Sequence, residues 1–207
     1  MENNTTALAA ALLIGCAPVA FATNTVDLSV RGSITPASCI PSLSGGGMID
    51  HGKLTAKDLA PEKPTALQTG TLMLQVNCDA ATFFTLTTYD NRAGSSAFHP
   101  SSHGLGMTQD DQKLGSVAFG VFDPVADDVP VNTILSNNDG VSWRPSSYLG
   151  HAGLTAFAAP SDQSTPIAIK DLSARLTVFT TLVRANDLTL VDEIPIDGHA
   201  TVQLKYW

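Results

Sequence analysis

The sequence has little positive charge. It contains 11 Lys and Arg against 19 Asp and Glu in 207 residues, a formal net charge of -8, and its basic residues form no run. Binding to nucleic acid or to an anionic membrane needs clustered Lys and Arg that neutralise phosphates. The composition therefore excludes nucleic acid as a partner, and the acidity is interpreted as a contribution to solubility.

Long hydrophobic runs are also missing. The one unbroken apolar run, residues 7–14, is too short to span a bilayer as a helix. Pro18 and an A-x-A site at residues 20–22 follow it, although the preceding MENN has no basic residue. We therefore predict a signal peptide over residues 1–22, cleaved after Ala22. A second interpretation is lipidation of Cys16, because residues 13–16 (LIGC) resemble a lipobox.

Cysteine is scarce. Removal of the signal peptide leaves Cys39 and Cys78, which an oxidising compartment would join in one disulfide. Two buried free thiols are the alternative. A metal site has less support, because neither cysteine lies in a C-x-x-C motif and no histidine stands at ligand spacing.

Catalytic motifs are missing as well. His99 and His103 are four residues apart, but turn residues beside them predict exposed loop histidines. Asp50-His51 has no G-x-S-x-G partner, and neither Asp110-Asp111 nor Asp127-Asp128 has a calcium-ligand ladder around it. We expect no catalytic residue, metal or cofactor, and the chain is not predicted to be an enzyme.

What the sequence does contain is short alternating stretches between turns. Aromatic residues make up 6%, whereas Thr, Ser, Val, Leu and Gly are abundant. We predict an all-β sandwich as one domain over residues 23–207. Its expected strands lie at 26–34, 71–78, 83–89, 116–122, 172–183, 188–196 and 200–206, with a strand after the Gly-rich turn at 43–52 and a helical turn at 55–59. Residues 95–115 are expected to form a loop, and residues 123–164 mostly turns.

Three phrases carry a resemblance to a known family. They are VRGSITPASC (30–39), LMLQVNC (72–78) and the terminal ATVQLKYW, with Gly32 seven residues before Cys39 and Tyr206 next to last. The sequence resembles subunits of chaperone-usher pili, and in particular uncharacterised fimbrial-like β-domain proteins of Gram-negative bacteria. The segment before Gly32 is shorter than usual in that family, and Gly198 lies nearer the terminus.

The resemblance implies an immunoglobulin-like sandwich that lacks its last strand. A periplasmic chaperone, and then the N-terminal extension of the next subunit, would supply that strand by β-augmentation. The implied acceptor groove and chaperone contact comprise Ala200, Val202, Leu204 and Tyr206, and the implied donor side chains are Val26, Leu28 and Val30. An outer-membrane usher and neighbouring subunits are further implied partners, and the chain would pass through the periplasm to a surface pilus.

Two alternatives remain open. The terminal residues are also compatible with an ordinary strand of a complete, self-contained sandwich. The chain would then be a secreted or lipid-anchored, adhesin-like binding module. Its loops over residues 95–164 would contact a host or glycan ligand through Trp143 and Tyr148, unless those rings pack beneath the loops.

Overall fold

The computed structural model of the chain describes residues 29–31 and 38–206. Two compact units divide the chain, residues 1–34 and residues 35–207. In the first unit the described residues, 29–31, are exposed and form no strand, so the strand predicted over residues 26–34 is not present in its described part. The predicted signal peptide, Cys16, Val26 and Leu28 lie outside the described residues.

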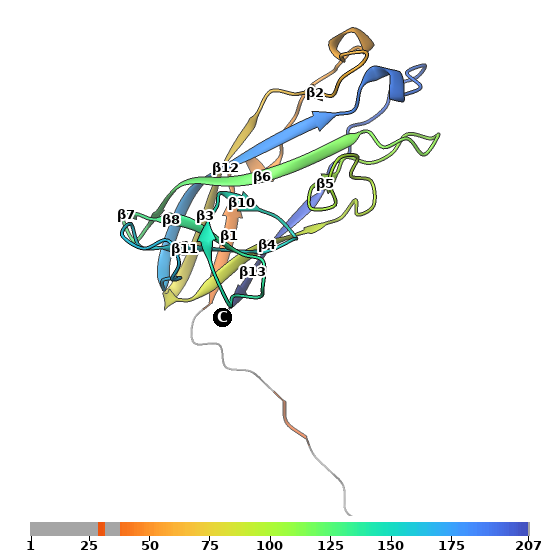
Figure 1. Cartoon of the computed structure of the whole chain (residues 1–207). Coiled ribbons are helices and arrows are strands. Elements are labelled where there is room, and N and C mark those ends of the chain that lie inside the picture. Colours follow the sequence, from red (N-terminus) through yellow and green to blue (C-terminus); the bar gives the residue numbers. More distant parts are fainter. Residues whose placement is uncertain (1–28, 32–37, 207) are drawn as a thin grey trace, which may run out of the picture. The chain divides into compact units, whose positions relative to one another are not determined.

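The second unit contains two antiparallel sheets (Figure 1). The first sheet has the order β1 (Cys39–Leu43), β3 (Gly70–Thr82), β12 (Ile169–Leu182), β6 (Gly115–Ala126) and β10 (Tyr148–Leu149), to which β2 (Thr65–Ala66), β5 (His103–Gly104) and β7 (Val129–Pro130) add short pairings. The second has the order β13 (Ala200–Tyr206), β4 (Phe84–Asp90), β11 (Leu154–Ala158), β8 (Asn132–Ser136) and β9 (Arg144–Pro145). The predicted all-β class and sandwich are confirmed.

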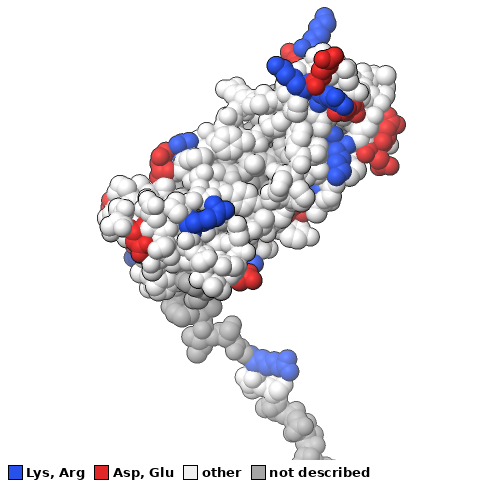
Figure 2. All heavy atoms as spheres, in the orientation of Figure 1, with Lys and Arg blue, Asp and Glu red and all other residues white. Residues whose placement is uncertain are grey.

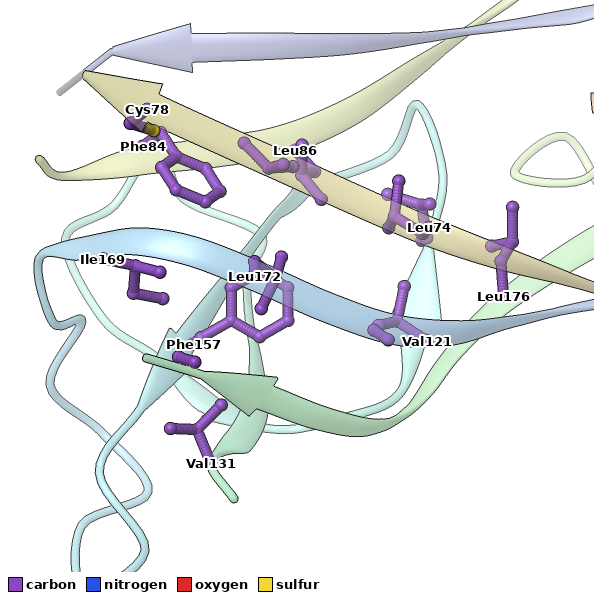
Figure 3. Packing of buried hydrophobic residues seen from close by; sticks show 14 of the residues in the cluster. Leu74, Cys78, Phe84, Leu86, Val121, Val131, Phe157, Ile169, Leu172 and Leu176 are labelled. Carbon is purple, nitrogen blue, oxygen red and sulfur yellow. The ribbon is translucent and has the colours of Figure 1, made fainter. Parts of the chain in front are cut away.

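The core lies between the two sheets (Figure 3). Alternation along β3 buries Leu74 and Val76 completely, and β4 contributes the fully buried Leu86 from the other sheet. Phe84 packs edge-on against Phe157 of β11, with ring centroids 6.4 Å apart. Each such side chain stabilises the fold by roughly 1.5–3 kcal/mol through burial. The apolar side chains that recur at every second position of the sequence therefore form the contact between the sheets.

Most of the predicted elements are confirmed. Strands β3, β4, β6, β12 and β13 cover the predicted positions, and η2 (Ala56–Asp58) is the predicted helical turn. In η2 the carboxylate of Asp58 accepts hydrogen bonds from the amide and hydroxyl of Thr55. These bonds, the amide bond foremost, lower the pKa of Asp58.

Three predictions of local structure are wrong. Residues 188–196 form no strand and follow a short 3-10 helix, η3 (Ala185–Asp187). No strand follows the Gly-rich turn η1 (Ser44–Gly47) within residues 48–52. Residues 123–164, predicted as turns, contain β8 and β11, which lie inside the second sheet.

His103 is also not the exposed loop histidine that the sequence predicts. It belongs to β5, is 1% exposed, and its Nε2 lies 2.7 Å from the Thr88 hydroxyl. His99 does lie exposed in the preceding loop. Within residues 29–31 and 38–206, no helix is long and apolar enough to cross a membrane.

Candidate functional site

Strand β13 forms one edge of the second sheet. Among the described residues it pairs with β4 alone. The side chains of Ala200, Val202 and Leu204 are half-buried, and the latter two pack against the core, whereas Thr201, Gln203 and Lys205 are exposed. The predicted alternation of the terminal strand is therefore present.

The backbone groups of β13 alternate in direction too. The amide of Asn91 in the turn after β4 donates to the carbonyl of His199, which fixes which residues face β4. Successive residues of an antiparallel strand present their N–H and C=O groups to opposite sides. Those of Ala200, Val202, Leu204 and Tyr206 therefore point away from β4, along the unpaired edge. The four residues named from the sequence thus carry the edge groups of this strand.

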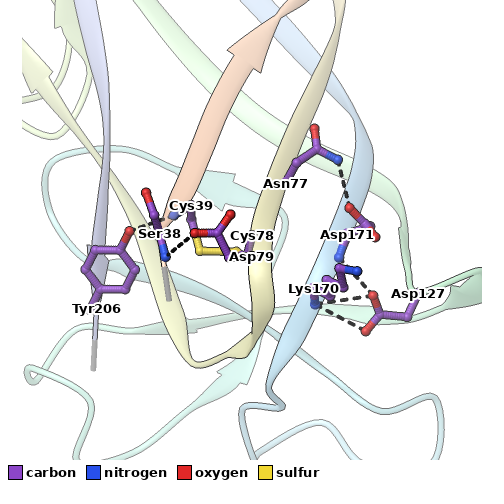
Figure 4. Close-up of a disulfide and its surroundings, with 9 residues drawn as sticks. All are labelled: Ser38, Cys39, Asn77, Cys78, Asp79, Asp127, Lys170, Asp171 and Tyr206. Carbon is purple, nitrogen blue, oxygen red and sulfur yellow. Dashed lines mark hydrogen bonds between the residues drawn. A yellow bond between two sulfur atoms is a disulfide. The ribbon is translucent and has the colours of Figure 1, made fainter. Parts of the chain in front are cut away.

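Strand β1 forms the matching edge of the first sheet. It pairs with β3 and is bonded to it by the predicted disulfide, Cys39–Cys78 (Figure 4). Just before β1, the carbonyl of Ser38 accepts a hydrogen bond from Asp79 of β3. By the same alternation, Cys39, Pro41 and Leu43 direct their backbone groups away from β3.

An apolar groove of about 190 Å³ lies between these two edges. One wall contains Leu43 of β1 with Ile49 beyond it, and the other contains Ala200 and Val202 of β13. The floor is formed by core side chains of the first sheet, namely Leu72, Val117, Phe119, Leu176 and Val178. The volume corresponds to about one benzene-sized group, or one or two aliphatic side chains.

Tyr206 connects β13 to β1 beyond the residues that line the groove. Its side chain reaches from β13 to β1, where its hydroxyl accepts a hydrogen bond of 2.8 Å from the amide of Cys39 (Figure 4). The ring remains 44% exposed. The two sheet edges are therefore bridged at the C-terminal end of β13.

Near its other end the groove adjoins a second hollow of about 440 Å³. Both are lined by Ile49, His51 and Ile196, so the two hollows lie next to each other. Residues 188–196, predicted as strands, form one wall of this second hollow. An exposed ion pair between Lys53 and Glu193 spans it and adds little stability.

The other sequence-predicted residues lie away from this groove or have structural partners. Val30 is 89% exposed and belongs to no strand. Trp143 packs against a cluster with Ile134, and its Nε1 donates to the carbonyl of Gly140. The Tyr148 hydroxyl donates to Ser101, and burial raises its pKa. Both residues are half-buried and have partners within the chain.

Charged side chains have local roles. The Asp127 carboxylate accepts hydrogen bonds from the amides of Lys170 and Asp171 at the turn between β6 and β7 (Figure 4).

On the face shown in Figure 2, charge gathers mainly at the end where β2 lies, and the middle carries few charged groups. In the described part of the chain, no three His, Cys, Asp or Glu side chains are placed to hold a metal ion.

These features define an antiparallel β-sandwich in which, among residues 29–31 and 38–206, each sheet has an unpaired edge and an apolar groove lies between the two edges. A sequence-family model described as "Protein of unknown function (DUF1120)" matches residues 28–103, which include β1, β3 and β4. The chain is 27% identical to Protein GltF of Escherichia coli (strain K12), over 99% of this chain and 98% of that protein. It is 24% identical to Uncharacterized protein YhcF of the same organism, over 89% of this chain and 92% of that protein.

Leu43 and Ile49 are among the groove residues that were missed in the sequence. Both lie in a stretch expected to form a Gly-rich turn and a short strand, and both help to wall the groove. A usable signal was Pro41, since proline within a sheet is confined to edges and bulges. It marks β1 as an edge strand from the sequence alone.

Proposed function

We propose that this chain is a structural subunit of a surface pilus, assembled by donor-strand complementation and contributing to cell adhesion. The observation that carries the proposal is the apolar groove between two unpaired sheet edges, β1 and β13. An extended peptide would add a strand beside β13, with its alternate side chains in the groove. Backbone hydrogen bonds supply affinity in this mode and the side chains supply specificity.

The proposed occupant, after a periplasmic chaperone, is the N-terminal segment of another copy. Residues 23–34 (TNTVDLSVRGSI) carry apolar residues at every second position from Val26 to Val30. The second compact unit begins only at Thr35, so this whole segment precedes it. An outer-membrane usher and neighbouring subunits complete the proposed set of partners.

An unpaired strand edge also argues for a partner on physical grounds. Exposed edge groups are templates for aggregation, and proteins usually cover or blunt them. Lys205 and Pro41 act as such protective residues here. The half-buried Val202 and Leu204 nevertheless leave apolar surface along the edge of β13. A donor strand would satisfy the edge groups and fill the groove together.

Coexpression with a periplasmic pilus chaperone tests the proposal. We expect the exported chain to copurify with the chaperone, and Val202→Lys to abolish copurification because it places a charge in the groove. Gln203→Lys is the matched control, since Gln203 is the neighbouring residue and its side chain is exposed. Circular dichroism of both variants verifies that they fold. Equal copurification of the two variants would contradict the proposal.

A further inference from the structure

The two edges of the groove differ in the hydrogen-bond donors that they offer. Along β13 the outward amides of Ala200, Val202 and Leu204 are available, because these residues point away from β4. Along β1 the three outward positions are Cys39, Pro41 and Leu43. Proline has no N–H, and the Cys39 amide already donates to Tyr206. Only the Leu43 amide remains on that side.

We propose that an incoming strand pairs with β13 alone and that Tyr206 sets its register. The proposal rests on the proposed function, since it concerns how the groove holds its donor strand. β1 acts as an apolar wall through Leu43 and as a row of carbonyls, and it supplies almost no donors. A strand between the edges therefore forms a regular antiparallel or parallel ladder on one side only.

Tyr206 limits how far the incoming strand extends along β13, and we call this role the stop. Its ring spans the gap between β13 and β1, and its hydroxyl occupies the first outward donor of β1. At the opposite end the groove adjoins the second hollow, and Ile49 and Ile196 line both. A docked strand therefore extends toward that open end and ends before Tyr206. Its apolar side chains align with the groove near Ala200 and Val202.

Amide hydrogen exchange by NMR, residue by residue, tests the one-sided pairing. The probe is a synthetic peptide of residues 23–34, added in excess to the exported chain. We expect exchange of the Val202 and Leu204 amides to slow by about tenfold or more while the Leu43 amide stays unchanged. Protection of all three amides overturns one-sided pairing and leaves the proposed function standing. Protection of none of them overturns both.

Substitutions on β1 test the reason for the asymmetry. Pro41→Ala restores an outward amide, so the peptide should bind roughly three- to tenfold more tightly, the gain from one added backbone hydrogen bond. Ser42→Ala is the matched control, because Ser42 already has an amide and directs it toward β3. An unchanged peptide affinity in Pro41→Ala would overturn the role of Pro41.

Substitution of Tyr206 tests the stop. In Tyr206→Ala the peptide should also protect the amide at position 206, which stays unprotected in the original chain. Lys205→Ala is the control, since its side chain is exposed and its backbone faces β4. If Tyr206→Ala shows the protection pattern of Lys205→Ala, Tyr206 does not set the register.

Discussion

His103 is a buried histidine held between two strands and two rings. Its Nε2 contacts the Thr88 hydroxyl, and the rings of His151 and Phe119 lie 4.8 and 4.9 Å from its own ring. Burial first, and the neighbouring His151 second, lower the pKa of His103 to about 4, although Asp90 raises it. The imidazole of His103 is therefore neutral in the folded chain at neutral pH.

We predict that this residue makes the fold weaker in acid. The folded pKa of about 4 lies below the unfolded value of about 6.5, so the unfolded chain takes up the proton first. The contribution of His103 is complete above pH 6.5. It is lost as the pH falls toward 4, by up to about 3 kcal/mol of unfolding free energy. Urea denaturation at pH 7 and pH 4.5 measures the difference.

A variant pair isolates the effect. His103→Gln keeps a polar group near Thr88 but cannot take up a proton, so its stability should change less between the two pH values. His99→Gln, in the exposed loop, should behave like the original chain. Identical pH dependence in all three proteins would refute this account of His103.

The burial of His103 shows where single residues escape a sequence argument. Its neighbours in the sequence indicate a loop, and β5 is a pairing of only two residues with β6. Nothing local distinguishes such a strand from a turn. Leu105, two residues later, lines the groove, and the surrounding sequence likewise gives no signal of that position.

Among the elements that border the groove, β1 is a short edge strand. It is five residues long, pairs with β3 alone among the described residues, and its Cys39 is bonded to Cys78. We predict that reduction, or the double substitution Cys39→Ser with Cys78→Ser, lowers stability by about 4 kcal/mol, from the length of the closed loop. Urea denaturation with and without reductant measures it. Coincident midpoints would show that the bridge contributes nothing.

The elements also show how far the sequence predicts this fold. Long alternating strands such as β3 and β12 and the terminal β13 were predictable, because their period-two pattern extends over seven or more residues. β8 and β11 were not, since each has five residues set among turns, and partners far along the chain decide their pairing. For residues 188–196 the error is the opposite one, since an alternating pattern predicted strands that the structure does not contain in this segment. Their alternation places Ile194 and Ile196 against core side chains without any strand partner.

The candidate site was predictable on one side only. The alternation of β13 put Ala200, Val202, Leu204 and Tyr206 on one face, and only the resemblance to pilus subunits named them as groove residues. The pairing with β4 directs the backbone groups of all four away from that strand. The opposite wall depends on how β1 pairs with β3 and on the irregular chain after it. The contact between Tyr206 and Cys39 joins residues 167 positions apart, and no local pattern reports it.

At the scale of the whole molecule, the groove and the N-terminal segment together predict self-association. The chain beginning at Thr23 carries both a proposed donor and an acceptor, whereas the chain beginning at Thr35 retains the acceptor alone. In sedimentation velocity, we expect the longer form to form oligomers as its concentration rises and the shorter form to remain monomeric. Burial of apolar side chains drives the contact, so added salt should weaken it little.

Two controls separate strand exchange from general stickiness. A peptide of residues 23–34 should dissociate the oligomers by occupying the groove, and the same peptide with Val26, Leu28 and Val30 replaced by Asp should not. Because the chain has a net charge of -8, non-specific association through charge would be suppressed at low salt and released at high salt. Oligomers that persist in the chain beginning at Thr35, or that resist the unmodified peptide, would show that another surface joins the copies.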